Sequence, residues 1–260
     1  MQDDKAAGPP YRAYVLCTSP RSGSTLLCRL LAASGIAGRP ESYFHAPSVE
    51  SWAAELSRPP APGGDDLAFL RAVVEAAIAE GTAGTGLFGL RLQRHSFDFF
   101  LAQLARLHPG PRRDRDRFEA AFGRTLFIHL TRADKLAQAV SIVKAEQSGL
   151  WHVRPDGSEL ERLKPHQDPV YDGAAIRRHR DEMLAMDRQW GDWFAQQGIE
   201  PLSLTYDELA ADPRATLARV LRALGLDARV AGGVAVGVKR LSDETSRAWV
   251  ERFQAEQQGR

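Results

Sequence analysis

Short apolar runs alternate along the chain with longer stretches in which apolar positions recur every three to four residues. Four short runs are typical of strands buried on both faces of a sheet: 14–18, 87–92, 125–131 and 201–205. The longer stretches are typical of helices: 25–34, 67–80, 97–107, 134–147, 174–197, 213–224 and 243–257. This alternation predicts an α/β fold in three layers, with a central parallel sheet flanked by helices.

Three segments follow neither pattern and are predicted to be loops: 57–66, 108–117 and 154–172. The second carries charges of both signs and is typical of a solvated surface loop. The third is long for a compact fold, and long loops are often lids or partner-binding segments. The 260 residues suffice for one large core, so we expect a disordered leader at residues 1–12 and a single domain at residues 13–260.

The overall charge gives no sign of a nucleic-acid partner or of binding to a membrane surface. Lys and Arg number 34 against 33 Asp and Glu, a formal net charge of +1. No segment approaches the roughly 20 apolar residues of a membrane helix, and the first ten residues do not resemble a signal peptide, so we expect a cytoplasmic protein. Cys17 and Cys28 fall in apolar segments typical of buried thiols, and neither a disulfide nor a metal site is expected.

The segment between the first predicted strand and the first predicted helix, SPRSGS, is small, polar and flexible. Its amides and the following helix N-terminus together favour an anion site. Compared with the phosphate-loop pattern GxxxxGK[ST], residues 18–25 keep Gly23 and Thr25 but have Thr18 for the first glycine and Ser24 for the lysine. A turn without a ligand is the alternative.

The missing lysine indicates which anion the loop suits. In nucleoside triphosphatases this lysine and a magnesium ion neutralise the terminal phosphates. Here Arg21 remains in the loop, and strand 125–131 is followed by an arginine rather than by an acid. The loop therefore suits a less charged group without a metal, such as a sulfuryl group on a nucleotide phosphate, since a sulfate ester carries one negative charge.

A second anion site is predicted where strand 125–131 ends. Arg132 follows this strand at its carboxyl end, where open α/β sheets bind ligands. Ser141 shares one face of the following helix with Asp134 and Gln138. A cation and a hydroxyl in these positions can bind one further phosphate. The alternative is an ordinary helix start at which Ser141 has no ligand.

Five segments in this order resemble the bacterial sulfotransferase family typified by trehalose 2-sulfotransferase: LCTSPRSGSTLLCRLL, GRPESYFH, GLFGLRL, IHLTRADKLAQAVSIVKAEQSGLWH and KRLSDETSRAWVERF. The resemblance runs from about residue 14 to residue 253. It implies a P-loop-like fold and the sulfuryl donor 3'-phosphoadenosine-5'-phosphosulfate (PAPS), with 3'-phosphoadenosine 5'-phosphate (PAP) as product. It also suggests a homodimer, in which loop 154–172 or the C-terminal helix closes the partner's acceptor site.

The resemblance also implies which residues bind the donor. The positions that match the loop around the 5' phosphosulfate are Arg21, Ser22, Gly23, Ser24 and Thr25. Arg132 and Ser141 match the pair that binds the 3'-phosphate, and Arg240 matches a basic position near the same nucleotide. Tyr206 either lies near the adenine or simply packs at a helix start.

On the acceptor side the chain departs from the family pattern. Sulfuryl transfer needs an acceptor hydroxyl in line with the leaving phosphate and a base to take its proton. The trehalose-specific pattern has a glutamate before the aromatic pair that matches residues 43–44, and this chain has Ser42 there. Trehalose is therefore not the expected acceptor. The candidate bases are Glu41 and His45, with His95 and Asp98 less favoured.

Two other residue types are candidates for the acceptor side. Arg91 matches a family lysine at the end of a strand and is expected to stabilise charge on the leaving phosphate, unless it is a surface arginine. Trp52 and Trp151 fall outside clear core patterns, and either can offer a platform for a sugar ring.

The residues and the resemblance together favour a PAPS-dependent sulfotransferase that acts on a hydroxyl of a small molecule, such as a carbohydrate or another metabolite, without a metal. Two alternatives stay open. One is a catalytically impaired domain that senses PAP or PAPS. The other is a P-loop kinase that uses ATP and magnesium, which the absent lysine disfavours.

Overall fold

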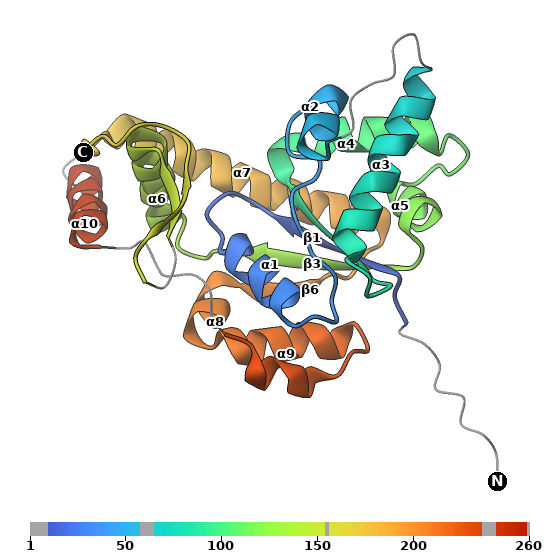
Figure 1. Cartoon of the computed structure of the whole chain (residues 1–260). Helices are drawn as coiled ribbons and strands as arrows, with labels where there is room; N and C mark the ends of the chain where they lie inside the picture. Colours follow the sequence, from blue (N-terminus) through green and yellow to red (C-terminus); the bar gives the residue numbers. More distant parts are fainter. Residues whose placement is uncertain (1–9, 58–64, 154–155, 236–242, 259–260) are drawn as a thin grey trace.

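The computed structural model describes residues 10–57, 65–153, 156–235 and 243–258. Its main sheet has four parallel strands in the order β2–β1–β3–β6 (Figure 1). Their bounds are Phe88–Gln93 for β2, Ala13–Thr18 for β1, Thr125–Thr131 for β3 and Leu202–Thr205 for β6. The four predicted strands and their parallel arrangement are confirmed.

Both faces of the sheet are buried, as the central strand β1 shows. Val15 and Cys17 belong to one apolar cluster, and Tyr14 and Leu16 belong to another. Neighbouring side chains of a strand point to opposite faces, so a strand covered on both sides has no polar alternation. This is why the segment reads as a continuous apolar run in the sequence.

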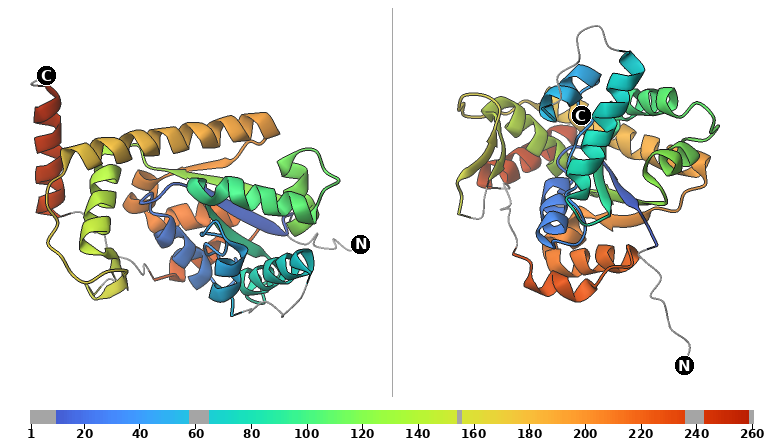
Figure 2. Two further views of the ribbon diagram at one scale, coloured as in Figure 1. Left: turned by 90° about the horizontal axis from the view of Figure 1, so that it is seen from above. Right: turned by 45° about the vertical axis from the view of Figure 1, so that its right-hand side comes forward.

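Helices form a layer on each side of the sheet (Figures 1 and 2). Residues of five helices join the first cluster: α2 Val49–Glu55, α3 Asp66–Thr82, α4 Arg94–Leu107, α5 Asp114–Phe122 and α7 Gly173–Gln197. Residues of four other helices join the second: α1 Ser24–Ala33, α8 Tyr206–Ala211, α9 Pro213–Ala223 and the 3-10 helix Ala228–Gly233. The predicted three-layer α/β architecture is confirmed.

A third cluster lies beyond the end of the sheet. It joins α6 (Lys135–Ser148), the start of the long helix α7 and the last helix α10 (Glu244–Gln258), with Val140, Ile176 and Phe253 at its centre. Figure 2 shows α7 reaching from this cluster along the sheet. An antiparallel hairpin of β4 (Leu150–Val153) and β5 (Glu159–Arg162) follows α6. No helix in the described ranges is long and apolar enough to cross a membrane.

Two of the predicted loops are partly wrong. Segment 108–117 becomes helical at Asp114, because Phe118 and Phe122, one turn apart, bury one face of α5 in the core. Segment 154–172 contains β5, which pairs with β4 although its own sequence is polar. Of loop 57–66, residues 58–64 lie outside the described ranges, and Asp65 caps α3. In the predicted leader, the Arg12 amide bonds the Arg124 carbonyl, while residues 1–9 are not described.

Gly38 turns the chain from α1 towards the edge of the sheet. Its φ is +68°, and a Cβ at this position would lie 2.4 Å from the carbonyl oxygens of both Gly81 and Leu87. Only glycine avoids both problems. The segment that follows runs beside β2, where the Arg91 amide donates to the Glu41 carbonyl at 3.0 Å. Gly38 thus fixes the path of the predicted acceptor segment.

We expect Gly38→Ala to lower the free energy of unfolding by about 1–3 kcal/mol, because the left-handed backbone is strained by a side chain and the two facing oxygens belong to backbone. Urea denaturation followed by circular dichroism measures this. Gly191→Ala, inside α7 with open space around the new methyl group, is the matched control and should be neutral or stabilising by up to about 1 kcal/mol. Equal stabilities of Gly38→Ala and the unsubstituted protein would contradict the tight crossing.

Candidate active site

A cavity of about 1490 Å³ opens at the carboxyl ends of the parallel strands. This is the edge where open α/β sheets bind ligands. Nine predicted site residues line it together: Arg21, Gly23, Ser24, Thr25, Glu41, His45, Arg91, Arg132 and Ser141. Of the remaining two, Ser22 is buried behind the loop, and Arg240 lies outside the described residues.

The loop between β1 and α1 has the backbone of an anion site. Arg21 and Gly23 have left-handed conformations, with φ of 61° and 87°. Alternation of left- and right-handed residues can turn successive amides towards one point. Gly23 is the N-cap of α1 and has no side chain to bond the amides of the first turn. These amides therefore have no acceptor from the N-cap side chain and can donate to a ligand.

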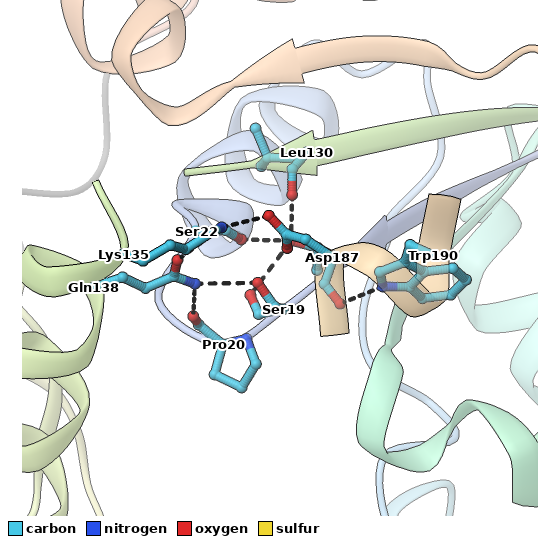
Figure 3. Close-up of polar contacts among 9 residues, drawn as sticks. Ser19, Pro20, Ser22, Leu130, Lys135, Gln138, Asp187 and Trp190 are labelled. Atoms are coloured by element: carbon cyan, nitrogen blue, oxygen red, sulfur yellow. Dashed lines mark hydrogen bonds and ion pairs between the residues drawn. The ribbon is translucent and has the colours of Figure 1, made fainter. Parts of the chain in front are cut away.

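Gln138 supports this loop from behind (Figure 3). It is fully buried, and its Nε2 donates to the Pro20 carbonyl at 2.6 Å and to Ser19 Oγ at 3.1 Å. Lys135, one turn earlier on α6, donates to Gln138 Oε1 at 3.3 Å and forms an ion pair with Asp187. On the helical face that the sequence predicts for Gln138, this side chain therefore contacts the loop itself.

Thr18, the last residue of β1, ties the loop to the sheet. Its Oγ1 donates to the Leu130 carbonyl at 2.9 Å, and its own carbonyl accepts from Trp190 Nε1 at 3.0 Å. Its hydroxyl also bonds the hydroxyl of Ser22. Thr18, which stands where the usual phosphate-loop pattern has a glycine, thus supports the loop. Because the Ser22 hydroxyl is bonded to Thr18, any contact of Ser22 with a ligand must come from its backbone.

Two guanidinium groups and a hydroxyl gather beside the loop. Arg21 Nε donates to Ser141 Oγ at 2.9 Å, and Arg132 Nη1 donates to the Arg21 carbonyl at 3.4 Å. Burial, and then the neighbouring charge of Arg132, lower the pKa of Arg21 to about 10. Both effects disfavour the charged form of Arg21, and the attraction of an anion in the cavity would offset them. The two predicted anion sites are thus one continuous cationic surface.

Tyr206 closes this surface at the start of α8. The Arg132 guanidinium lies over its ring, 4.5 Å from the centroid. The ring also packs against Gly23, where a Cβ would lie 2.8 Å from Tyr206 Cδ2. Tyr206 therefore packs at a helix start and also lines the cavity, and its position near an adenine stays a prediction.

Arg91 connects the loop to the acceptor segment. Its side chain is only 15% exposed, which excludes the alternative of a surface arginine. Nε donates to Ser42 Oγ at 2.7 Å, Nη1 donates to Thr25 Oγ1 at 2.9 Å, and Nη2 lies 3.8 Å from Glu41 Oε2. Glu41 and Ser42 therefore contact the same guanidinium.

The candidate bases differ in position. His45 and His95 line the exposed rim of the cavity with their rings edge to face, 4.8 Å between centroids. Partial burial, and then Arg91, lower the pKa of His45, which favours an unprotonated ring able to accept a proton. Asp98 instead pairs with Arg94 at 2.9 Å, is 77% exposed and does not line the cavity.

The two candidate tryptophans have different environments. Trp52 is fully buried and packs edge to face with Phe44, so its predicted role as a sugar platform is wrong. Trp151 lines the cavity on β4, and its carbonyl accepts from Arg21 Nη1 at 2.5 Å. Only Trp151 keeps a surface available to a ligand.

His152 is a site residue that the sequence did not reveal. It lies on β4, with Nε2 3.1 Å from Thr25 Oγ1 and 3.4 Å from Glu161 Oε2. Burial lowers its pKa first, and Arg21 and Arg91 lower it further, to about 3. The residue belongs to no phosphate-loop pattern, and only the fold of the hairpin brings it to the cavity.

Comparison with known proteins shows the family of the chain. The sequence model of the family "Stf0 sulphotransferase" matches residues 13–256. The chain belongs to the Stf0 sulphotransferase family. It is 31% identical to trehalose 2-sulfotransferase from Mycobacterium tuberculosis (strain ATCC 35801 / TMC 107 / Erdman), over 94% of this chain and 95% of that protein. With trehalose 2-sulfotransferase from Mycolicibacterium smegmatis (strain ATCC 700084 / mc(2)155) the identity is 29%, over 95% and 96%.

Membership of the Stf0 family confirms the resemblance seen in the sequence. Among solved structures, the sulfotransferase domain from the Synechococcus PCC 7002 olefin synthase is 20% identical to the chain, with a TM-score of 0.34 over 87% of this chain and 77% of that one.

Within the described part of this Stf0 protein, no three His, Cys, Asp or Glu side chains gather in a way that can hold a metal ion.

The low pKa of His152 predicts a specific loss of stability in acid. In the unfolded chain its pKa is about 6.5, so between pH 6.5 and about 3 the unfolded state takes up a proton that the folded state resists. Stability should therefore fall on acidification, and less so in His152→Gln. Urea denaturation at pH 7 and pH 4.5 gives both differences. His166→Gln, which changes an exposed imidazole, is the control and should fall as steeply as the unsubstituted protein.

Proposed function

We propose that this Stf0-family protein transfers a sulfuryl group from PAPS to a hydroxyl of a small molecule, a carbohydrate or another metabolite, and releases PAP. One observation carries the proposal: the loop before α1 and the pair Arg132 and Ser141 face the same cavity. PAPS has an anionic group at each end of its ribose, the 5' phosphosulfate and the 3'-phosphate. Two adjacent cationic sites match such a molecule.

The loop would bind the 5' end of this donor. The amides of the first turn of α1, including those of Ser24 and Thr25, would donate to the phosphosulfate oxygens, with Arg21 at the side. Arg132 and Ser141 would bind the 3'-phosphate, and Tyr206 would lie beside the adenine. Arg240 lies outside the described residues, and its contact with the nucleotide stays a prediction.

The charges disfavour the kinase alternative. A triphosphate needs a lysine at the position of Ser24 and a metal held partly by an acid after a neighbouring strand. The strand β3 is followed instead by Arg132, which lies next to Arg21. Arginines suit phosphate and sulfate oxygens, because their planar groups donate two parallel hydrogen bonds.

The reaction would proceed by in-line displacement. The acceptor oxygen forms a bond to sulfur while the bond from sulfur to the 5' phosphate oxygen breaks, and negative charge moves to that leaving oxygen. Arg91 is bonded to Thr25 at the end of the donor loop, which places a cation near this charge. The acceptor proton would pass to Glu41 or to His45.

The sensor alternative rests on one residue. Ser42 stands where the trehalose-specific pattern has a glutamate, and its hydroxyl accepts from Arg91 at 2.7 Å. A domain without any base would still bind PAPS but transfer its sulfuryl group slowly. Incubation with sulfur-labelled PAPS and a panel of hydroxyl acceptors separates the two functions, since only the enzyme transfers label to an acceptor.

The implied homodimer and the cytoplasmic location stay predictions. Size-exclusion chromatography with light scattering measures the first directly. Because β5 and the segment after it lie at the edge of the cavity, where Leu163 and His166 line it, a partner could contribute to the acceptor site there.

Arg132→Ala should weaken PAP binding by about 1.5–3 kcal/mol, the usual range for a charge-assisted hydrogen bond. Calorimetry without magnesium measures this. Arg188→Ala, an exposed arginine of α7, is the control and should bind PAP normally. An unchanged affinity in Arg132→Ala would remove Arg132 from the site, and tighter binding of ADP with magnesium than of PAP would favour the kinase.

Loss of the base should slow transfer without weakening donor binding. We expect His45→Ala or Glu41→Gln to lower kcat by about 10²–10⁴, the range of general base catalysis, with PAP affinity retained. Steady-state rates with labelled PAPS and calorimetry give the two quantities. Asp98→Asn, outside the cavity, is the control. If both variants turn over normally, neither residue is the base.

A further inference from the structure

The β4–β5 hairpin is bonded to the donor loop at two points. Arg21 Nη1, in the middle of the loop, donates to the Trp151 carbonyl. Thr25 Oγ1, at the end of the loop, lies 3.1 Å from Nε2 of His152. Two consecutive residues of β4 thus contact the middle and the end of one short loop.

The partners of His152 determine which of its ring nitrogens carries a proton. Nε2 faces Thr25 Oγ1 at 3.1 Å and Glu161 Oε2 at 3.4 Å. The negative charge of the Glu161 carboxylate near Nε2 favours the neutral tautomer that carries its proton on this nitrogen, because a lone pair there would face the carboxylate. On this tautomer the N–H donates to Thr25 Oγ1, 3.1 Å away.

The Thr25 hydroxyl can then still donate one hydrogen bond. Its oxygen has two lone pairs, and the donors that approach it are Arg91 Nη1 at 2.9 Å and His152 Nε2. The hydroxyl proton is therefore available to a third group. Thr25 belongs to the first turn of α1, where the amides await an anion. The hydroxyl joins these amides as a donor to that anion.

We propose that His152 is a positioning residue, which holds the Thr25 hydroxyl as a donor to the sulfuryl end of the bound nucleotide and fastens the β4–β5 hairpin to the donor loop. The identity of the anion rests on the proposed function, whereas the contact between hairpin and loop does not. In this proposal His152 takes no direct part in sulfuryl transfer.

The surrounding charges favour a neutral ring in this role. Arg21 of the loop, Arg29 of α1 and Arg91 of β2 act on the ring against a further positive charge, and Glu161 of β5 is the nearby carboxylate. A neutral ring can keep its single N–H on Thr25, with the Glu161 carboxylate 3.4 Å away. A protonated ring would add a fourth cation to this group.

Hydrogen exchange in the unliganded protein tests the fastening. We expect the amides of β4 and β5 to exchange about ten times faster in His152→Ala and in Thr25→Val, with those of the main sheet unchanged. His108→Ala, after α4, is the matched control and should leave the hairpin unaffected. If both variants keep the original exchange rates in the hairpin, the proposal is wrong, whatever the donor proves to be.

Sulfuryl transfer tests the positioning of Thr25. We expect His152→Ala to lower kcat about 10–100-fold, with PAP affinity reduced less than about tenfold, and His152→Gln to restore most of the rate by donating through its amide. In the Thr25→Val background, His152→Ala should have no further effect on kcat. Two effects that multiply independently would overturn the proposal. If the unsubstituted protein ignores PAP, the proposed function fails, and the exchange experiment still decides the role of His152.

Discussion

The site depends on two arginines held close together at the carboxyl edge of the sheet. Arg21 and Arg132 are linked by a hydrogen bond from one guanidinium to the backbone of the other residue, and burial together with this neighbouring charge lowers the pKa of Arg21 to about 10. Such an arrangement is unfavourable without an anion, since both desolvation and repulsion oppose the charges. The fold tolerates it because the loop is fixed from behind, through Gln138 to α6 and through Thr18 to β3. An anion that bridges the two groups converts this repulsion into binding energy.

Arg91 extends the same principle to the acceptor side. Its three nitrogens contact Ser42, Thr25 and Glu41, so that one guanidinium sets the distance between the donor loop and the segment after Gly38. A glutamate at position 42, as in the trehalose-specific pattern, would pair with this cation. The Ser42 hydroxyl accepts from Arg91 but carries no charge, so Glu41 is the carboxylate that faces this guanidinium. A serine at this position thus leaves less negative charge beside Arg91 than a glutamate would.

The sequence predicted those parts of the fold whose signals are local. The strands were visible because burial on both faces gives continuous apolar runs, and the anion loop was visible because a strand, a small polar segment and a helix follow one another. Helix α5 and strand β5 were missed because their positions depend on packing and pairing with distant segments rather than on their own periodicity. Periodicity placed Gln138 on the correct face but could not show that the loop covers this face. His152 reaches the cavity only through the hairpin, and the same limit applies to it.

The donor and acceptor sides therefore have different structural origins. The groups of the proposed donor site follow the ends of β1 and β3, whose positions are fixed by pairing in the central sheet. The groups for the acceptor come from the segment 39–45 and from the hairpin after α6, which are attached to the sheet through a few side chains such as Arg91 and His152. Segments held in this way can change sequence without loss of the fold. If the proposed function holds, a chain with Ser42 in place of the glutamate is thus expected to keep the donor site at the ends of β1 and β3 and to differ from the trehalose-specific pattern on the acceptor side.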